Sequence, residues 1–410
     1  MKIAFNTLGC KLNQYETELI KEMAEEASFE IVNFNSNADI YVINTCSVTM
    51  SADKQSRNLI RRVRRRTKKA KIIVTGCFSK NNKNLLSKSD IYVANKDKYH
   101  FFKSFFGTKK DSINKFSNHT RAFVKIQTGC NRFCSYCIVP YLRGKESSRA
   151  PSSIINEIRT LVDNGFKEII ITGVHIGRYN FNGENLTSLL KLIENIEGLQ
   201  RIRLGSLNPE EMEDELLLYI SSSEKVCHHF HISLQSGSKK ILKLMGRDYT
   251  PYEVAKKIEK INRLMDDCAI GADIITGFPF EGDNEFDETY NFINKLPFAY
   301  LHVFRYSLRA NTLASVFPMQ INEKLKKQRS AILRELGLKK SIIFRKQFID
   351  KNTEVLIETK KDRTTDMMVG FTGNYIRVLL PQAENCGNTL KTVKIKKIVG
   401  YDTYGNIVDN

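Results

Sequence analysis

The feature that most constrains the fold is an alternation of strand and helix patterns along most of the 410 residues. From residue 120, six apolar runs typical of strands are separated by helical patterns, at 122–126, 168–172, 201–204, 229–234, 269–275 and 301–306. Repeated βα units predict a parallel sheet with helices packed on it. Six units, fewer than the eight of a complete barrel, predict a partial α/β barrel over residues 120–346, ending in a helix near 323–346.

The two ends of the chain follow different patterns. Residues 1–108 contain apolar runs at 3–5, 39–43, 71–74 and 90–93 with helical stretches at 13–27 and 53–66, which predicts an open parallel α/β sheet. Residues 109–119 are polar and predict a linker. Residues 347–410 contain short strand patterns at 353–358, 375–380 and 391–399 separated by glycines, which predicts a small β-barrel. We therefore expect an α/β multidomain protein with boundaries near these positions.

The overall composition narrows the class of protein. The formal net charge is +19, which favours a polyanionic partner such as nucleic acid, although a lysine-rich composition without such a partner is equally compatible with it. We find no apolar run long enough to span a membrane and no signal-peptide pattern, so we predict a cytoplasmic protein without a membrane partner. Nine cysteines, an odd number, favour metal, cluster or catalytic roles over disulfides.

Three cysteines lie within one eight-residue loop directly after the strand predicted at 122–126. Cys130, Cys134 and Cys137 have CxxxCxxC spacing. Three thiolates can bind three irons of a [4Fe–4S] cluster and leave the fourth iron open, whereas four thiolates fill the cluster. A zinc site is the alternative, but zinc needs a fourth ligand. The histidines that might supply it, His228, His229 and His231, lie in a strand pattern far along the chain.

The spacing of this loop, at the start of a six-unit α/β region, resembles the radical-SAM superfamily. The resemblance implies that the open iron binds S-adenosylmethionine and that the three cysteines form the catalytic cluster. Small or polar residues follow successive predicted strands, where active sites of α/β barrels lie, although a single such residue is more often only part of a turn. By the same resemblance, the residues expected to bind S-adenosylmethionine are Tyr136, Gly173, Ser206, Gln235 and Ser236.

A second set of cysteines occupies equivalent positions in the first 108 residues. Cys10, Cys46 and Cys77 each come directly after a predicted strand. Because the carboxyl ends of parallel strands meet at one edge of a sheet, these residues are expected to converge there and to hold a second cluster. The alternative is that they are small buried residues, as we interpret Cys227, Cys268 and Cys386.

The motifs together resemble one group, the methylthiotransferase family, over essentially the whole chain. They are Gly9-Cys10, Asn44-Thr45-Cys46, Thr75-Gly76-Cys77, and the continuation of the radical-SAM loop as Ile138-Val139-Pro140-Tyr141-Leu142-Arg143-Gly144. The resemblance implies an N-terminal domain with one [4Fe–4S] cluster, a radical-SAM barrel with another, and a C-terminal TRAM domain that binds RNA. It also implies replacement of an adenine C2 hydrogen by a methylthio group, with a flavodoxin or ferredoxin-type reductant.

The substrate branch is indicated by two short segments. Residues 7–18, TLGCKLNQYETE, and residues 370–375, GFTGNY, are similar to the branch that acts on N6-threonylcarbamoyladenosine at position 37, in the anticodon stem-loop of tRNA. The sequence departs from that branch at Leu12, Ser147, Arg305 and Asn311, none of which is a cysteine. The alternatives are methylthiolation of isopentenyladenosine or of a ribosomal protein, or a radical-SAM enzyme of other specificity.

RNA binding is predicted most clearly by a basic helix. Residues 54–71 contain ten lysines and arginines and no acidic residue. Such a density of like charge favours contact with phosphate, although a solvated basic surface remains the alternative. The residues we expect to contact RNA are Arg57, Arg61, Arg62, Arg65, Lys394 and Lys396. A non-catalytic iron–sulfur protein that binds RNA is the alternative from another functional class.

Overall fold

The computed structural model describes residues 1–77, 86–117, 119–382 and 386–408. Its first part is a five-stranded parallel sheet in the order β2-β1-β3-β4-β5. The strands are β1 (Lys2–Thr7), β2 (Glu30–Val32), β3 (Ile40–Thr45), β4 (Lys71–Gly76) and β5 (Ile91–Tyr92), and the helices are α1 (Lys11–Glu26), α2 (Met50–Arg66) and α3 (Lys98–Phe106). The open parallel sheet expected from the sequence is confirmed, while β2 and α3 were not expected.

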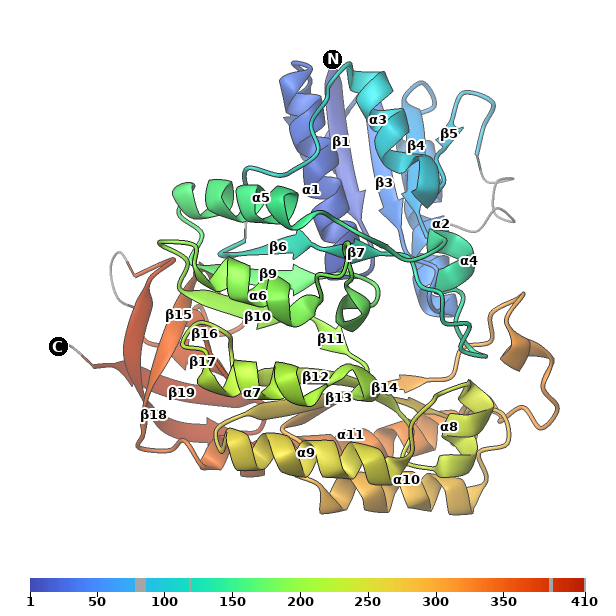
Figure 1. The fold of residues 1–410 in the computed structure, drawn as a ribbon. Coiled ribbons are helices and arrows are strands. Elements are labelled where there is room, and N and C mark those ends of the chain that lie inside the picture. The colour runs from blue at the N-terminus through green and yellow to red at the C-terminus, as the bar shows by residue number, and fades with distance from the viewer. Residues whose placement is uncertain (78–85, 118, 383–385, 409–410) are drawn as a thin grey trace.

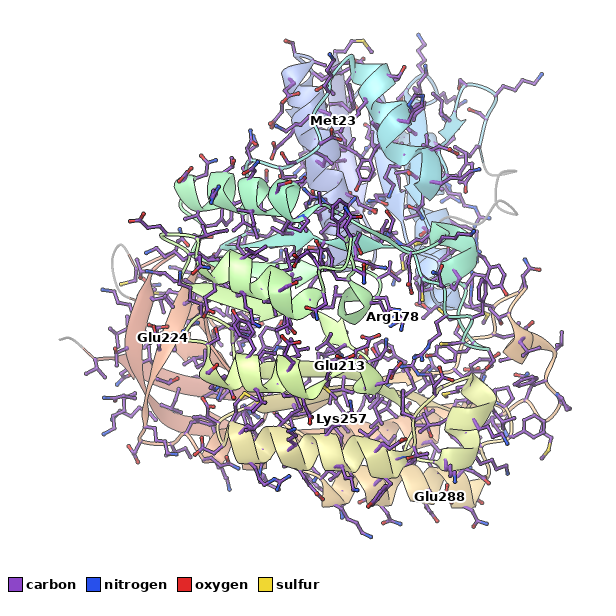
Figure 2. All side chains as sticks on the ribbon, in the orientation of Figure 1. Met23, Arg178, Glu213, Glu224, Lys257 and Glu288 are labelled. Carbon is purple, nitrogen blue, oxygen red and sulfur yellow. The ribbon has the colours of Figure 1, made fainter. Side chains whose placement is uncertain are left out.

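Successive side chains along each strand point to opposite faces of this sheet, so they pack into two separate apolar cores. Ile3 and Val42 pack with residues of α1 and α3, including Met23, which Figure 2 labels. Ala4 and Tyr41, one position along, pack with residues of α2 on the opposite face. The first of these cores continues into the central part of the chain, so the sheet and the central strands share apolar packing.

The central part contains six main parallel strands, all at the positions expected from the sequence. They are β6 (Arg121–Lys125), β9 (Glu168–Thr172), β10 (Arg201–Leu204), β12 (His229–Gln235), β13 (Ala269–Thr276) and β14 (Tyr300–Arg305). Hydrogen bonding groups them as β10-β9-β6 and as β11-β12-β13-β14, where β11 is Ser206–Leu207. An isolated parallel bridge between Ile202 and Val226 lies where the two groups meet.

Helices cover the outer side of these strands (Figure 1). They are α5 (Pro151–Asp163), α6 (Leu186–Glu194), α7 (Asp214–Ser222), α8 (Lys239–Met245), α9 (Pro251–Leu264), α10 (Asp283–Lys295) and α11 (Glu323–Lys346), the last with the bounds expected from the sequence. A short helix α4 (Val139–Arg143) and the small strands β7 (Gln127–Thr128) and β8 (Ser147–Ser148) follow β6. None of the described helices is long and apolar enough to cross a membrane.

The segment expected to be a linker is packed onto the protein. Ile113 and Phe116 are buried in the main core. The backbone N–H of Asn114 donates to Glu22 Oε1 at 2.9 Å, and that of Ser117 donates to Glu18 Oε1 at 2.9 Å. Two apolar residues in a polar stretch give no helical or strand period, so the sequence pattern did not reveal this packing.

The last part of the chain forms a closed barrel in the order β15-β16-β17-β19-β18. Its strands are β15 (Asn352–Lys361), β16 (Met368–Thr372), β17 (Arg377–Leu380), β18 (Leu390–Val399) and β19 (Asp402–Ile407), of which β16 and β19 were not expected. Two arginines of β10 attach it to the central strands. Arg201 Nη1 donates to Phe371 O at 2.9 Å, and Arg203 Nη1 donates to Gly373 O at 2.8 Å.

Candidate active site

All six cysteines of the two predicted sets line one cavity of about 410 Å³. The cavity lies where the first sheet meets the carboxyl ends of the central strands, and its lining also contains Asn13, Arg143, His175 and Arg247. The other three cysteines, Cys227, Cys268 and Cys386, lie elsewhere. The structure therefore brings together the two sets that the sequence placed far apart.

Strand register brings Cys10, Cys46 and Cys77 together. They follow β1, β3 and β4, which are neighbours in the sheet, with Thr45 paired to Gly76. Gly9 has φ +101°, and a Cβ there would lie 2.9 Å from Cys46 Cβ, so glycine is required at this close approach. Asn13 joins two of the loops, because its Nδ2 donates to Leu8 O at 2.8 Å and to Thr45 O at 2.9 Å.

The three thiols differ in exposure: Cys10 is exposed toward the cavity that it lines, Cys46 is half-buried and Cys77 is buried, and one strong cation, Arg143, lies near them. Burial raises the pKa of the Cys10 thiol and raises the pKa of Cys46 to about 11, while Arg143 acts in the opposite direction. Arg143 is itself fixed, since its Nη1 donates to Glu16 Oε1 at 2.8 Å. Thiols become thiolates when they bind a metal centre, so three thiols gathered at one sheet edge fit an iron–sulfur cluster.

The loop of Cys130, Cys134 and Cys137 is held by backbone contacts. The Cys130 N–H donates to Gly144 O at 3.0 Å, and Gly129 before it has φ +74° with no room for a Cβ, which would lie 1.9 Å from Lys145 O. Ser135 anchors the other end, through its N–H to Met245 O at 3.0 Å and its Oγ to Leu244 O at 2.7 Å. The loop is thus fixed by α4 on one side and α8 on the other.

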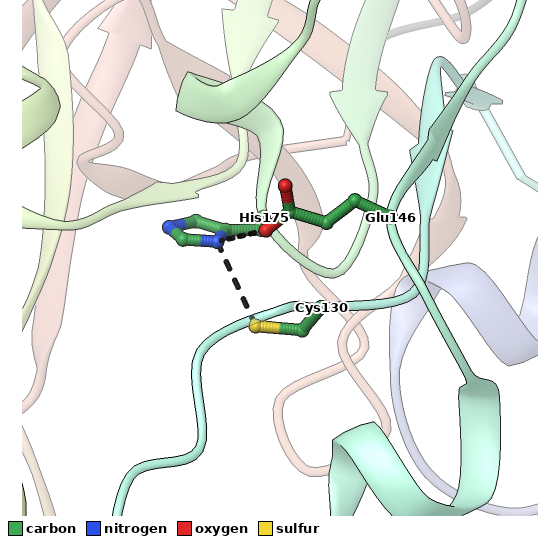
Figure 3. Close-up of side chains that lie close together, drawn as sticks. All are labelled: Cys130, Glu146 and His175. Atoms are coloured by element: carbon green, nitrogen blue, oxygen red, sulfur yellow. Dashed lines mark hydrogen bonds and ion pairs between the residues drawn. The ribbon is translucent and has the colours of Figure 1, made fainter.

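Two basic side chains contact the sulfur atoms of this loop. Arg247 Nη1 lies 3.5 Å from Cys134 Sγ. His175 Nδ1 lies 3.7 Å from Cys130 Sγ and 3.2 Å from Glu146 Oε1 (Figure 3). Burial opposes the charged imidazole, but the interactions with Cys130 and Glu211 outweigh it and raise the pKa of His175 to about 10. Both residues therefore place positive charge beside the thiols.

The residues expected to bind S-adenosylmethionine divide into two groups. Tyr136, Gly173, Ser206 and Gln235 line the cavity. Ser236 lies outside the described lining: it is fully buried, with its Oγ 3.1 Å from Thr289 Oγ1 and accepting the Ser238 N–H at 3.1 Å. Its contacts shape the turn after β12, where the preceding residue Gln235 has φ +68°.

The sequence did not single out several residues that the structure places in the cavity. His175 comes two residues after Gly173, and Asn13 follows Cys10 by three, so nearness to the motifs was a usable signal for both. Arg247 had no such signal, because it lies more than 100 residues from the cysteine that it contacts. The three histidines considered as zinc ligands lie outside the described lining of the cavity.

The residues expected to contact RNA lie on two surfaces. On α2, Arg61, Arg62 and Arg65 are exposed, whereas Arg57 forms an ion pair with Asp53. On β18, Lys396 is exposed and Lys394 Nζ lies 3.9 Å from Asp350 Oδ1.

Comparison with known proteins identifies the families that the chain resembles. Residues 2–95 match the family described as Uncharacterized protein family UPF0004, and residues 124–293 match the Radical SAM superfamily. Among solved structures, the radical S-adenosylmethionine methyltransferase TsrM from Kitasatospora setae superposes with a TM-score of 0.57 at 13% identity over 77% of each chain, which shows a shared fold. The fold and the cysteine loop define a radical-SAM enzyme, a class that uses a [4Fe–4S] cluster and S-adenosylmethionine.

Proteins of similar sequence identify the family more specifically. The chain is 40% identical to the threonylcarbamoyladenosine tRNA methylthiotransferase MtaB of Aquifex aeolicus, over 86% of this chain and 90% of that protein. It is 37% identical to the Bacillus subtilis protein of the same name, over 97% and 94%. The tRNA-2-methylthio-N(6)-dimethylallyladenosine synthase of Syntrophus aciditrophicus is 34% identical, over 90% and 88%. The chain belongs to the family of threonylcarbamoyladenosine tRNA methylthiotransferases.

Proposed function

We propose that the chain adds a methylthio group to C2 of N6-threonylcarbamoyladenosine at tRNA position 37. The observation that carries the proposal is the convergence of two three-cysteine sets on one cavity. Cys130, Cys134 and Cys137 would hold the cluster that binds S-adenosylmethionine, and Cys10, Cys46 and Cys77 would hold the second [4Fe–4S] cluster. When bound, these groups supply a carbon radical, a sulfur atom and a methyl group, which general acid–base chemistry does not provide.

The protein's own residues position these groups. Tyr136, Gly173, Ser206 and Gln235 would contact S-adenosylmethionine, because they line the same cavity as the first cysteine set. Arg247 and His175 contact the sulfur atoms of Cys134 and Cys130 and so would orient them toward the cluster. Arg143 lies near Cys10 and lowers the pKa of its thiol, against the effect of burial.

The remaining parts of the chain would serve RNA binding and electron supply. We assign residues 1–108, 120–346 and 347–410 to a methylthiotransferase domain, a partial (βα)6 radical-SAM barrel and a TRAM domain. The last assignment is supported by the closed five-stranded barrel. The substrate would be the anticodon stem-loop, the electron donor a flavodoxin or ferredoxin-type protein, and the compartment the cytoplasm, where tRNA is modified.

The experiment that tests the function is mass spectrometry of tRNA nucleosides from a strain without this gene. We expect the 2-methylthio derivative of threonylcarbamoyladenosine to disappear and to return when the intact gene is supplied. A gene with Cys134→Ala should not restore it. An unchanged level of that nucleoside, or loss of methylthio-isopentenyladenosine in its place, would contradict the proposal.

A further inference from the structure

Charged side chains of β6, β9 and β10 gather in the interior of the central strands, here called the lumen, where they also meet carboxylates of β15. Arg203 on β10 is fully buried, and its Nε donates to Glu168 Oε1 at 2.7 Å. Arg121 Nη2 lies 2.8 Å from Glu358 Oε1, and Arg201 Nη2 lies 2.8 Å from Glu354 Oε1. Each of these arginines therefore has a carboxylate of its own.

Lys11 is a further cation among these groups, and it has no such partner. It is the first residue of α1, is half-buried, and lies between Cys10 and Leu12, which both line the cysteine cavity. Its electrostatic neighbours are Arg121, Arg203, Glu168 and Tyr375. Across the described residues, no hydrogen bond or ion pair reaches its ammonium group. A cation at the amino end of a helix also opposes the helix dipole, so stability of the fold does not explain its presence.

Two buried polar atoms of the same lumen are also unsatisfied. Among the described residues, Arg121 Nη1 and His229 Nδ1 have no hydrogen-bond partner. The nearest carboxylate to Arg121 Nη1, that of Glu168, is 3.9 Å away, beyond hydrogen-bond distance. Buried polar groups in folded proteins normally have partners, so unpaired groups beside an unpaired cation indicate a site for an anionic ligand.

A chain of side chains links these charged groups to the cavity that holds the cysteines: Asp273 lines the cavity and contacts His231, and Tyr300 OH lies 2.9 Å from His231 Nδ1 and 2.8 Å from His229 Nε2. Asp273 and Ser233 line that cavity, and both belong to the central strands. Asp273 Oδ1 lies 2.8 Å from His231 Nε2 and 3.4 Å from His302 Nδ1, so this connection is polar as well. An adenine in the cavity can therefore extend a substituent on N6 into charged surroundings.

We propose that Lys11 binds the carboxylate of the threonylcarbamoyl group in this lumen and thereby selects that substrate. The assignment rests on the proposed function and identifies a specificity-determining residue for it. A carboxylate accepts charge-assisted hydrogen bonds from Lys11 and Arg121. An apolar N6 substituent would remove water from the same groups without offering an acceptor, which costs free energy.

The test uses the reconstituted full-length enzyme and two anticodon stem-loops. One carries N6-threonylcarbamoyladenosine, and the other carries the analogue with a carboxamide in place of the carboxylate. For the unmodified enzyme, we expect the carboxamide to raise KM roughly tenfold to a hundredfold. Lys11→Gln should raise KM for the natural stem-loop by a similar factor. It should raise KM for the carboxamide stem-loop little further, because the substitution and the carboxamide remove the same contact.

Controls separate this role from an effect on the neighbouring cysteine. Lys11→Arg should recover most of the KM, and Lys21→Gln, the same change in the same helix, should leave it unaltered. Iron content and visible absorbance report whether Lys11→Gln still binds both clusters. The role of Lys11 would be overturned if the unmodified enzyme had the same KM for both stem-loops. It would also be overturned if the effects of Lys11→Gln and of the carboxamide on KM multiplied when the two changes were combined. An unmodified enzyme that leaves both stem-loops without a methylthio group would instead refute the proposed function.

Discussion

At the scale of single residues, the second cysteine set depends on a glycine. Gly9 adopts φ +101°, and a Cβ there would lie 3.1 Å from Cys46 Sγ. Gly9→Ala should therefore displace Cys46 or Cys10, at a strain cost of order 1–3 kcal/mol. We expect reconstituted Gly9→Ala to lose about half of its iron, since one of two equal clusters is affected. Cleavage of S-adenosylmethionine, which needs the Cys130 loop, should persist.

A matched control comes from another glycine with positive φ. Gly107 has φ +69°, but a Cβ there would meet nothing within 4 Å. Gly107→Ala should thus strain the backbone without a steric clash, and the variant should keep its full iron content. If both variants kept their iron, the close approach at Gly9 would not matter for the cluster.

At the scale of elements, the arginines of α2 fall into two groups, those that bind neighbouring segments and those that face solvent. Arg64 forms an ion pair with Asp90, and Arg66 Nη2 donates to Phe34 O at 2.6 Å, so both fasten the helix to its surroundings. Arg61, Arg62 and Arg65 are exposed, and among the described residues no hydrogen bond or ion pair holds their guanidinium groups, although Arg62 lies 6.0 Å from the centroid of the Phe34 ring. The phosphate-binding role predicted for α2 therefore falls on these three residues.

Reversing these three charges should weaken tRNA binding. If each contacts one phosphate, changing all three to Glu should flatten the plot of log Kd against log salt by about two to three units. Filter binding at salt concentrations from about 50 to about 200 mM measures this slope. The control reverses three exposed charges of α11, Lys324, Lys327 and Arg334, with the same change in net charge. Equal slopes for the two variants would exclude a specific role for α2.

The elements also show what the sequence can and cannot predict. The six central strands follow from their apolar runs, and the convergence of Cys10, Cys46 and Cys77 follows from their place after parallel strands. The strand β16 was missed because its apolar run is interrupted by Gly370, which packs against Val355. The contact of Arg247 with Cys134 was missed because only the closure of the central strands brings α8 to the cysteine loop.

At the scale of the whole molecule, a buried polar layer joins the first sheet to the central strands. Tyr15 OH on α1 donates to Glu157 Oε1 on α5 at 2.8 Å. Glu16 forms an ion pair with Lys98 and accepts from Arg143. Such a layer contributes little net stability compared with apolar packing, but it has strict geometric requirements. It therefore fixes how the two cysteine sets face each other across the cavity.

Lys125, within this layer, makes the stability of the protein depend on pH. Its Nζ donates to Tyr99 OH at 2.8 Å, and burial lowers its pKa from 10.5 to about 7 although Glu16 acts in the opposite direction. Between pH 7 and 10.5 the unfolded chain binds more protons at this residue than the folded chain, so the free energy of unfolding rises with pH there. The slope from one such group is at most about 1.4 kcal/mol per pH unit.

Lys125→Met should remove this slope. Without the buried amine, cluster-free protein should be stabilised relative to the unmodified chain at pH 7, and the difference should shrink toward pH 9. Urea unfolding at pH 7, 8 and 9 measures it. Lys69→Met, at an exposed lysine, serves as the control and should keep the slope of the unmodified chain. A difference between Lys125→Met and the unmodified chain that is constant with pH would mean that Lys125 stays charged in the folded protein. The polar layer would then hold an additional buried cation between the helices of the first sheet and the central strands.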